Sequence, residues 1–428
     1  MRLLIVSYSY TPALTPRAFR WAAVAAELVR RGHDVHVLCA AAGAAGRDAD
    51  GVVVHRVRDW LLDGASRVTA GTPAAAAAPA GGWRTRLRGG VRALWRALYW
   101  PDFACGWVIP ATRAARALAA EKRFDWIVSV SHPFTGHLVG LLSDAHARGT
   151  RWFVDIGDPF HLMHEPSPNN HRLYGWLNRA VEARVVAGAD ALSVTTASTQ
   201  QLYAAHFGLP AERIDVIPPL LSLPPAPPPT PRTGDEPLRL VFVGTLYRRL
   251  RSPRFLLACL AALQEALSES HPHRRVELHF YGTLNDCADE FAACPPAVRD
   301  ALVTHGMVGR AEVLQAMVDA DVLVNIGNDS EAQLASKVIE YMAVGKPILN
   351  LVSFARDTSV AALAAYPAAL TLARDAGLSP ATVAALREFV LAPPAVPPAV
   401  AAAVRERYSA AQVACHYESI FDSTSLRS

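Results

Sequence analysis

Short apolar segments alternate with helical patterns in the first half of the chain. Residues 3–7 form an apolar run typical of a buried parallel strand, and residues 16–31 repeat apolar positions at helical spacing until Gly32. A second apolar run follows at 35–39. This order of strand, loop, helix, glycine and strand predicts the opening of a doubly wound α/β sheet. The alternation returns in apolar runs at 126–130, 152–156, 191–195 and 215–218, with a helix predicted over 134–147.

The same pattern starts again at residue 238. An apolar strand over 238–244 ends in Gly244, and a helix over 253–268 and a strand over 276–282 follow it. The remaining predicted elements are helices at 311–320 and 337–344 and strands at 322–326 and 347–352. The sequence therefore predicts an α/β protein with two Rossmann-like doubly wound domains facing a central cleft. Ligands of such folds bind at the carboxyl ends of the strands.

Prolines mark the boundaries between the predicted domains. The 428 residues include 31 prolines, of which nine lie in 218–237 and four in 393–398. Because proline-rich segments are stiff and interrupt regular elements, we predict a linker at 218–237. It separates a first domain at 1–217 from a second domain at 238–398, and the chain length is sufficient for two domains that each bury a core.

Composition narrows the class of protein further. The formal net charge of +4 is slight, so a general nucleic-acid binder is not expected. The six cysteines lie far apart without a C-x-x-C pair, which is typical of reduced cytosolic thiols rather than of a disulfide framework or zinc site. The apolar start of the chain is too short for a signal peptide, and no run approaches the roughly 20 apolar residues of a membrane span. We therefore expect a cytoplasmic protein.

One segment breaks the α/β alternation. Residues 70–82 are of low complexity, and 83–100 follow with apolar positions on one helical face and Arg88, Arg92 and Arg96 on another. Such a helix, with Trp83, Trp95 and Trp100 nearby, fits peripheral contact with the inner face of an anionic membrane. The alternative is that its apolar face packs on the first domain.

The segment 327–349, GNDSEAQLASKVIEYMAVGKPIL, carries the clearest chemical pattern. A loop after a strand leads into a helix, where free backbone N–H groups can hold a phosphate or a sugar hydroxyl. Lys337 adds a positive charge in the first turn. Glu340 is a suitable bidentate acceptor for the two hydroxyls of a ribose, or alternatively the partner of Lys337 in an i, i+3 ion pair.

This segment resembles the donor-site signature of the GT-B glycosyltransferases of family 4, which are retaining enzymes that use nucleotide sugars. The run S-K-V-x-E-Y-M-A-x-G-K-P-I-L carries the resemblance, and other parts fit in order. They are GHDV at 32–35, VFVG at 241–244, HG at 305–306 with 314–324, and the segment 408–421, which is similar to the final helix of the family. The resemblance implies that 399–428 form a C-terminal helix that crosses back to the first domain.

The resemblance also implies roles for residues of the second domain. Glu340 corresponds to the second glutamate of the E-x7-E motif of the family, which binds the ribose, but the first glutamate is replaced by Ala332. This departure leaves the carboxylate contact to the transferred sugar without its usual residue. We therefore treat the site as a variant of the family pattern.

The loop after the first strand of the second domain is expected to bind the diphosphate. Gly244 and Thr245 allow close backbone approach, and Arg248, Arg249 and Arg251 follow them. The family places one or two basic residues here, and we favour Arg249 and Arg251, whose guanidinium groups can bind phosphate oxygens in pairs. The alternative is a solvated basic loop.

In the first domain, polar residues follow two predicted strands. His132 stands where family members often carry a histidine near the transferred sugar, with a structural role as the alternative. Asp155 and Asp158, in VDIGDPF, are similar to a D-x-x-D-P segment of a bacterial subgroup. Asp158 could orient or deprotonate the acceptor hydroxyl, or form a turn before Pro159. Arg17 and Arg20 are further candidates for phosphate or acceptor contacts.

These residues lead to a functional expectation. The resemblance implies a retaining glycosyltransferase that moves a sugar from a nucleoside-diphosphate sugar to a hydroxyl of a glycan or lipid-linked acceptor in bacterial surface-polysaccharide or glycolipid synthesis. His132 and Asp158 are its catalytic candidates. Because no D-x-D motif occurs in a suitable loop, we expect no obligatory metal and no cofactor. The rivals are an inactive nucleotide-sugar-binding or partner protein and a nucleotide-sugar 2-epimerase. A dehydrogenase is disfavoured because the loop 7–16 contains no glycine.

Overall fold

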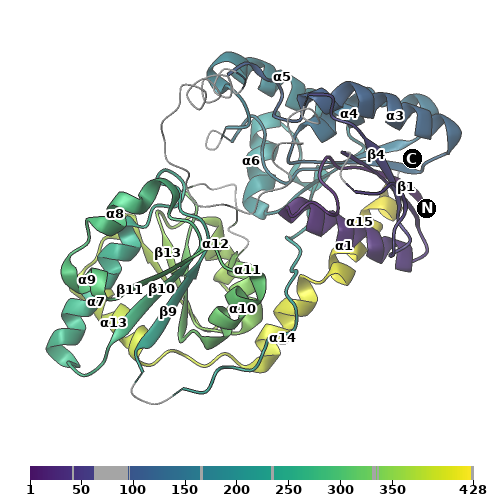
Figure 1. Cartoon of the computed structure of the whole chain (residues 1–428). Coiled ribbons are helices and arrows are strands. Elements are labelled where there is room, and N and C mark those ends of the chain that lie inside the picture. The colour runs from purple at the N-terminus through teal and green to yellow at the C-terminus, as the bar shows by residue number, and fades with distance from the viewer. Residues whose placement is uncertain are drawn as a thin grey trace, which may run out of the picture. The chain divides into compact units, whose positions relative to one another are not determined.

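The computed structural model of the chain describes residues 1–40, 43–61, 95, 97–163, 167–232, 236–329, 334 and 337–425. They form two compact units, one made of Met1–Leu220 with Ala410–Ser428 and the other of Leu221–Ser409. Each unit is built around its own sheet (Figure 1). The low-complexity segment 70–82, Arg88, Arg92, Arg96 and Ala332 lie outside the described residues.

The sheet of the first unit has the strand order β3-β4-β2-β1-β5-β6-β7-β8, and all its pairings are parallel except β3 with β4. The chain winds outward in one direction from β1 through β2 to β4 and then returns to β5 on the other side of β1. The direction of winding therefore reverses between β1 and β5, where doubly wound folds bind ligands. The strands are β1 (Arg2–Val6), β2 (Asp34–Ala40), β3 (Gly46–Arg47), β4 (Val53–Val57), β5 (Trp126–Val130), β6 (Arg151–Asp155), β7 (Ala191–Val194) and β8 (Ile214–Val216).

Helices cover both faces of this sheet. This is expected because its central strands are mainly apolar on both sides and must be buried on both. In β1, Leu3 and Ile5 pack against α1 (Pro16–Arg30) and α15 (Ala410–Ser425), whereas Leu4 and Val6 belong to the apolar cluster on the opposite face. That opposite cluster includes side chains of α3 (Val108–Glu121), α4 (Thr135–Leu142), α5 (His171–Gly188) and α6 (Ala197–Phe207). Helix α4 is shorter than predicted, because the chain leaves it at Ser143 and makes a separate short turn at His146–Arg148.

The second unit has a six-stranded parallel sheet in the order β11-β10-β9-β12-β13-β14. Its winding reverses between β9 and β12, which pair directly. The strands are β9 (Leu238–Val243), β10 (Val276–Tyr281), β11 (Leu302–Gly306), β12 (Val322–Ile326), β13 (Ile348–Val352) and β14 (Ala369–Ala373). The fold class predicted from the sequence, α/β with two doubly wound parallel sheets, is confirmed.

The helices of the second unit also lie on two faces, visible on either side of the sheet in Figure 1. One face carries α7 (Arg254–Ser270), α8 (Ala288–Ala292), α9 (Pro296–Asp300) and α13 (Pro380–Leu391). The other carries α10 (Arg310–Asp319), α11 (Lys337–Val344), α12 (Thr358–Leu363) and α14 (Pro398–Arg407).

The chain segments near the unit boundaries differ in detail from the sequence-based expectation. The proline-rich residues from Leu221 onward belong to the second unit, where the Thr230 hydroxyl donates to Asp319 at 2.7 Å and Arg232 pairs with Asp321 at 2.8 Å. Residues 399–428, expected as one helix, contain all of α14 except its first residue, and the separate helix α15. Helix α14 belongs to the second unit and α15 to the first.

Candidate functional site

Two loops meet at the point in the second unit where the winding of the sheet reverses. From the segment after β9, Arg251 Nη2 donates a hydrogen bond to Asn328 Oδ1 at 2.8 Å, and Asn328 follows β12. A backbone bond from the Asp329 N–H to the Leu250 carbonyl, at 2.7 Å, joins the same two loops. Because ligands of doubly wound sheets bind at this crevice, the pair of loops is the first candidate site.

Arg251 is a cation held in this crevice without an ion pair to any carboxylate in the described residues. Its described contacts are to neutral acceptors, the Asn328 side chain and, at 3.5 Å, the Thr245 carbonyl, and its covered Nε has no acceptor in the described part of the chain. Burial lowers the pKa of the Arg251 guanidinium. A desolvated guanidinium of this kind gains most from an anion that brings its own charge, and phosphate oxygens match its geometry.

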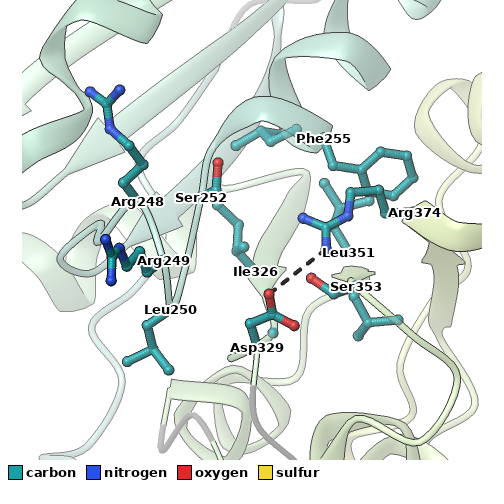
Figure 2. A pocket seen from close by; sticks show the side chains of 13 residues that line it. Arg248, Arg249, Leu250, Ser252, Phe255, Ile326, Asp329, Leu351, Ser353 and Arg374 are labelled. Atoms are coloured by element: carbon teal, nitrogen blue, oxygen red, sulfur yellow. Dashed lines mark ion pairs between the residues drawn. The ribbon is translucent and has the colours of Figure 1, made fainter. Parts of the chain in front are cut away.

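The neighbouring arginines are arranged differently. Arg248 bonds to the Asp286 carbonyl and to the carboxylate of Asp289, and in Figure 2 its side chain points away from the other labelled residues. Arg249 is exposed and lines a small cavity of about 30 Å³, in which Arg374 Nη2 lies 3.8 Å from Asp329 Oδ2 (Figure 2). This volume holds a water molecule or two. Of the two arginines favoured from the sequence, Arg251 is therefore the one fixed at the crevice.

The predicted glycine loop is shaped by a close backbone contact. Gly282, at the end of β10, has φ of 137°, and a side chain there would place its Cβ only 1.9 Å from the Gly244 carbonyl oxygen. Glycine is therefore required at 282 for both its conformation and its packing. This contact sets the path of the chain at Gly244 and Thr245, which leads to Arg251.

Helix α11 brings the other predicted residues to the same sheet edge. The buried Tyr341 hydroxyl accepts a hydrogen bond from the Val243 N–H at 2.9 Å, directly before Gly244. Lys337 Nζ and Glu340 Oε2 are 2.6 Å apart, so the ion pair considered from the sequence is present. Both side chains are partly exposed, at 31% and 21%. Their contacts with a nucleotide stay a prediction.

Asp357, which the sequence reading missed, lies beside this crevice. It precedes α12 and is 2% exposed. Its Oδ1 accepts from the Ser359 N–H and hydroxyl at 2.8 and 2.6 Å, whereas its buried Oδ2 has no hydrogen-bond partner among the residues that the structure describes. A side chain at Gly327 would meet this Oδ2 at 2.4 Å. In sequence, an aspartate before a short helix is typical of an N-cap. No sequence pattern therefore indicated that Asp357 Oδ2 is unpaired.

In the first unit, His132 stands in the loop between β5 and α4, next to the β1–β5 reversal. Its ring packs near Phe103, with centroids 5.8 Å apart. The fully buried Asp102 accepts from the Thr135 N–H and hydroxyl and from the Ala104 N–H, and it interacts electrostatically with His132. Burial raises the pKa of Asp102. The structure thus places His132 at a ligand-binding edge beside a buried carboxyl group.

Asp158 lies at the same edge, in a loop that a second buried carboxylate holds. Glu182 Oε1 accepts from the Phe160 N–H at 3.1 Å and its Oε2 from the His161 N–H at 2.8 Å. Burial raises the pKa of Glu182, and these bonds oppose the shift together with one from the Tyr203 hydroxyl. Glu182 therefore positions the segment that carries Asp158.

Two other polar candidates of the first unit have structural roles. Asp155 is 1% exposed and accepts from Trp21 Nε1, the Ser193 hydroxyl and the Tyr417 hydroxyl at 3.1, 2.8 and 2.8 Å. Arg20 is also buried, and it donates to Tyr417 and to the Pro218 carbonyl. Asp155 therefore belongs to the core of the first unit. The contact of Arg20 with phosphate or acceptor that the sequence suggested is wrong, because the packing of α15 encloses both side chains.

No described helix is long and apolar enough to cross a membrane. Among the described residues no group of three or more His, Cys, Asp or Glu side chains could hold a metal ion. The absence of an obligatory metal stays a prediction.

The two sheets and the sites at their carboxyl edges define a glycosyltransferase of the GT-B fold, as comparison with known families bears out. Residues 18–219 match the glycosyl transferase 4-like domain, and residues 237–358 match glycosyl transferases group 1. The chain belongs to the glycosyltransferase family that these two domains make up. No curated protein matches the sequence significantly.

Solved structures share the fold over the whole length at low identity. The apo form of the lipopolysaccharide outer core galactosyltransferase WaaB is 12% identical, with 99% of each chain covered and a TM-score of 0.58. A glycosyltransferase from Rickettsia africae ESF-5 is 9% identical, covering 100% of this chain and 99% of that chain with a TM-score of 0.61. An E. coli structure titled trehalose-6-phosphate, bound with UDP-2-fluoro glucose, is 12% identical, covering 98% and 99% with a TM-score of 0.60.

Proposed function

We propose that this glycosyltransferase moves a sugar from a nucleoside-diphosphate sugar to a hydroxyl acceptor with retention of anomeric configuration. The observation that carries the proposal is Arg251, a half-buried guanidinium at the strand-order reversal of the second unit that makes no ion pair with any described side chain. A diphosphate supplies the charge and the oxygen acceptors that this group lacks.

The neighbouring residues suit the remainder of a nucleotide sugar. The backbone at Gly244 and Thr245 would approach the phosphates, and Arg249 would add a second guanidinium at the edge of the crevice. Glu340 would accept the two ribose hydroxyls, with Lys337 holding its carboxylate or binding phosphate itself. Tyr341 supports this arrangement because its hydrogen bond to Val243 fixes α11 beside the glycine loop.

The chemistry proposed needs stabilisation of the departing diphosphate more than a protein nucleophile. As the sugar–oxygen bond breaks, negative charge accumulates on the diphosphate, and Arg251 and Arg249 stabilise that charge. The acceptor hydroxyl attacks from the face that the diphosphate leaves, and one diphosphate oxygen takes its proton. In the first unit, His132 would contact the transferred sugar and Asp158 would orient the acceptor hydroxyl.

The acceptor we propose is a glycan or lipid-linked glycan of surface-polysaccharide synthesis. Support comes from the fold similarity to the lipopolysaccharide galactosyltransferase. The exposed side chains of Leu173 and Trp176 on α5 also suit contact with a membrane.

The Arg251→Ala variant tests the proposal. We would titrate UDP-glucose, GDP-mannose and ADP-glucose into wild type, Arg251→Ala and Arg254→Ala by calorimetry. Arg254 is a matched control because it lies three residues on, is 67% exposed and pairs with Glu290. We expect wild type and Arg254→Ala to bind one nucleotide sugar equally, and Arg251→Ala to lose at least tenfold in affinity, since a charged hydrogen bond contributes about 1.5–3 kcal/mol.

Three outcomes would contradict the proposal in different ways. Equal affinity of Arg251→Ala and wild type would remove Arg251 from the site. Binding without transfer to any glycan or lipid-linked acceptor would favour an inactive binding protein, and epimerisation of the nucleotide sugar alone would favour the epimerase. The anomeric configuration of a transferred sugar, read by NMR, decides between retention and inversion.

A further inference from the structure

The buried carboxylate of Asp357 ends a chain of polar side chains that runs across the second sheet. Asn325 Nδ2 donates to Asn350 Oδ1 at 2.7 Å. The Ser359 hydroxyl oxygen lies 3.0 Å from the same Asn350 oxygen and 2.6 Å from Asp357 Oδ1, and its single proton is shared between these two acceptors. Every side chain in this chain is at most 3% exposed. The network fixes Asp357 and satisfies one of its oxygens, while no described residue donates to Oδ2.

Two unpaired polar atoms of opposite kind therefore lie in one region. Asp357 Oδ2 packs against Gly327, the residue before Asn328. Asn328 is the hydrogen-bond partner of Arg251, whose Nε also lacks an acceptor within the described ranges. Arg251 and Asp357 attract each other electrostatically but form no described hydrogen bond. Leaving such buried groups unpaired costs about 1–3 kcal/mol each, so the region is suited to a ligand or a proton.

The charges that face Asp357 come from several elements. Arg251 approaches from the segment after β9, and Asp329 from the segment after β12 adds a like charge. From β13 and α12 the facing groups are the neutral Asn350 and Ser359. Burial, the largest cause, together with Asp329 raises the pKa of the Asp357 carboxyl, whereas Ser359 and Arg251 oppose the shift.

We propose that binding of a nucleoside-diphosphate sugar at Arg251 is coupled to the uptake of one proton by Asp357. This inference rests on the proposed function of the site. In the free protein the Asp357 carboxylate is the negative group that partly balances Arg251. A diphosphate brings negative charge to the same guanidinium, and two anions sharing a poorly solvated site repel each other. The carboxylate then takes a proton from solvent and becomes a neutral acid.

The balance of charge at Arg251 and Asp357 favours proton uptake when the diphosphate binds. Before binding, Arg251 and the Asp357 carboxylate carry one positive and one negative charge. After binding, the guanidinium faces the diphosphate, and the protonated Asp357 Oδ2 becomes an O–H donor where the structure shows an oxygen without a partner. The coupling makes nucleotide-sugar affinity fall as pH rises, by up to about tenfold per pH unit between the pKa values of Asp357 in the free and bound protein.

Calorimetry in several buffers measures the proton directly. UDP-glucose, GDP-mannose or ADP-glucose, whichever binds, is titrated into the full chain in buffers of different ionisation enthalpy, from pH 5.5 to 8.5. The diphosphate of a nucleotide sugar is a diester and does not titrate in this range. For wild type we expect a net uptake that approaches one proton at its maximum. In Asp357→Asn, which keeps the cap acceptor Oδ1, the uptake should disappear and the affinity should become independent of pH.

Two further variants make the result specific. Asp329→Asn removes an exposed carboxylate of the same region and should leave the maximal uptake near one proton. If Asp357→Asn does not fold, Asp357→Ser serves in its place, because serine is also a good N-cap and cannot titrate here. Binding without proton uptake in wild type, or the same uptake in wild type and Asp357 variants, would overturn the inference. A complete lack of binding would instead overturn the proposed function.

Discussion

At the scale of single residues, three arginines that are close in sequence have different partners in the second unit. Arg248 and Arg254 both contact acidic side chains of α8, whereas Arg251, between them, is turned toward the neutral acceptor Asn328. A basic run in a sequence therefore does not identify which guanidinium binds a phosphate. Arg251 is distinguished by the absence of an ion pair with any described carboxylate.

Lys337 and Glu340 offer a direct test of whether an ion pair or a nucleotide contact explains Glu340. If the pair is only structural, Lys337→Ala and Glu340→Ala should each change the free energy of unfolding by a few tenths of a kcal/mol and leave binding unchanged. We expect instead that Glu340→Ala reduces nucleotide-sugar turnover by at least a hundredfold, because the ribose loses its acceptor. Steady-state kinetics checks this, and a wild-type rate in Glu340→Ala would remove Glu340 from the site.

At the scale of elements, short and mainly apolar runs predicted the strands beside the two reversal points. The runs at 3–7, 126–130, 238–244 and 322–326 lie at β1, β5, β9 and β12, which flank the two reversal points. The strand β14, with the sequence ALTLA, was missed because its alanines and its surroundings resemble a helix. The helix α3 was missed because its alanine-rich sequence shows little contrast between apolar and polar positions.

The candidate site was predictable only in part, for a related reason. Gly244, Arg251 and Glu340 stand at strand ends or helix starts that the sequence pattern locates. Asp357 and Asp102 could not be found this way, because what sets them apart is burial and the partners of individual oxygens. Those properties arise from packing between segments that are distant in sequence. For the same reason the sequence did not show that Asp155 is enclosed, because Tyr417, which covers it, lies 262 residues away.

Helix α5 leads to a prediction about membrane contact. Leu173 and Trp176 are 48% and 74% exposed on the same side of the helix, and the Tyr174 hydroxyl between them donates to the carbonyl of the exposed Leu98. The sequence just before Leu98, residues 83–96, contains five arginines. We expect binding to vesicles that contain phosphatidylglycerol, and several-fold weaker binding in Trp176→Ser, as measured by sedimentation.

A matched control for this prediction is Val216→Ser, which changes a single exposed apolar side chain on β8. It should bind vesicles as wild type does. Equal binding of wild type to phosphatidylglycerol and phosphatidylcholine vesicles would count against an electrostatic contact, and no loss in Trp176→Ser would count against the face on α5.

At the scale of the whole molecule, the first unit depends on the last helix of the chain. Tyr417 and Phe421 of α15 are fully buried against Trp21 and Phe153. The Tyr417 hydroxyl joins Arg20 to Asp155, so the packing of α15 completes both an apolar cluster and a buried charge network. The stability of the first unit is thus tied to residues that follow the entire second unit in sequence.

This network predicts how the first unit responds to acid. Burial alone would raise the pKa of Asp155, but the charges of Arg20 and Arg17 and the bonds from Ser193 and Tyr417 lower it below its ordinary value. A lowered folded-state pKa contributes stability that is complete above the unfolded value, about 3.9, and is lost as the pH falls through the folded value. We expect unfolding of the first unit, followed by urea titration and tryptophan fluorescence, to become easier below about pH 4.

The Asp155→Asn variant should be less stable than wild type at neutral pH by about 3–5 kcal/mol, because it removes the negative charge that faces the buried Arg20 and the partly buried Arg17. Its stability should also change less than that of wild type between pH 5 and pH 3. Parallel curves for the two proteins over this range would show that Asp155 does not carry the acid response.

The late position of α15 also has a consequence for synthesis on the ribosome. The strands of the first sheet emerge early, but the helix that covers Leu3, Ile5 and Phe153 is made only after roughly 190 further residues of the second unit. At about 5–20 residues per second this interval is about 10–40 seconds. During that time the part of this sheet face that α15 covers stays exposed, with only α1 packed beside it, while the second unit can already fold. We therefore expect chaperones to bind the nascent chain mainly at its N-terminal unit, which is made first.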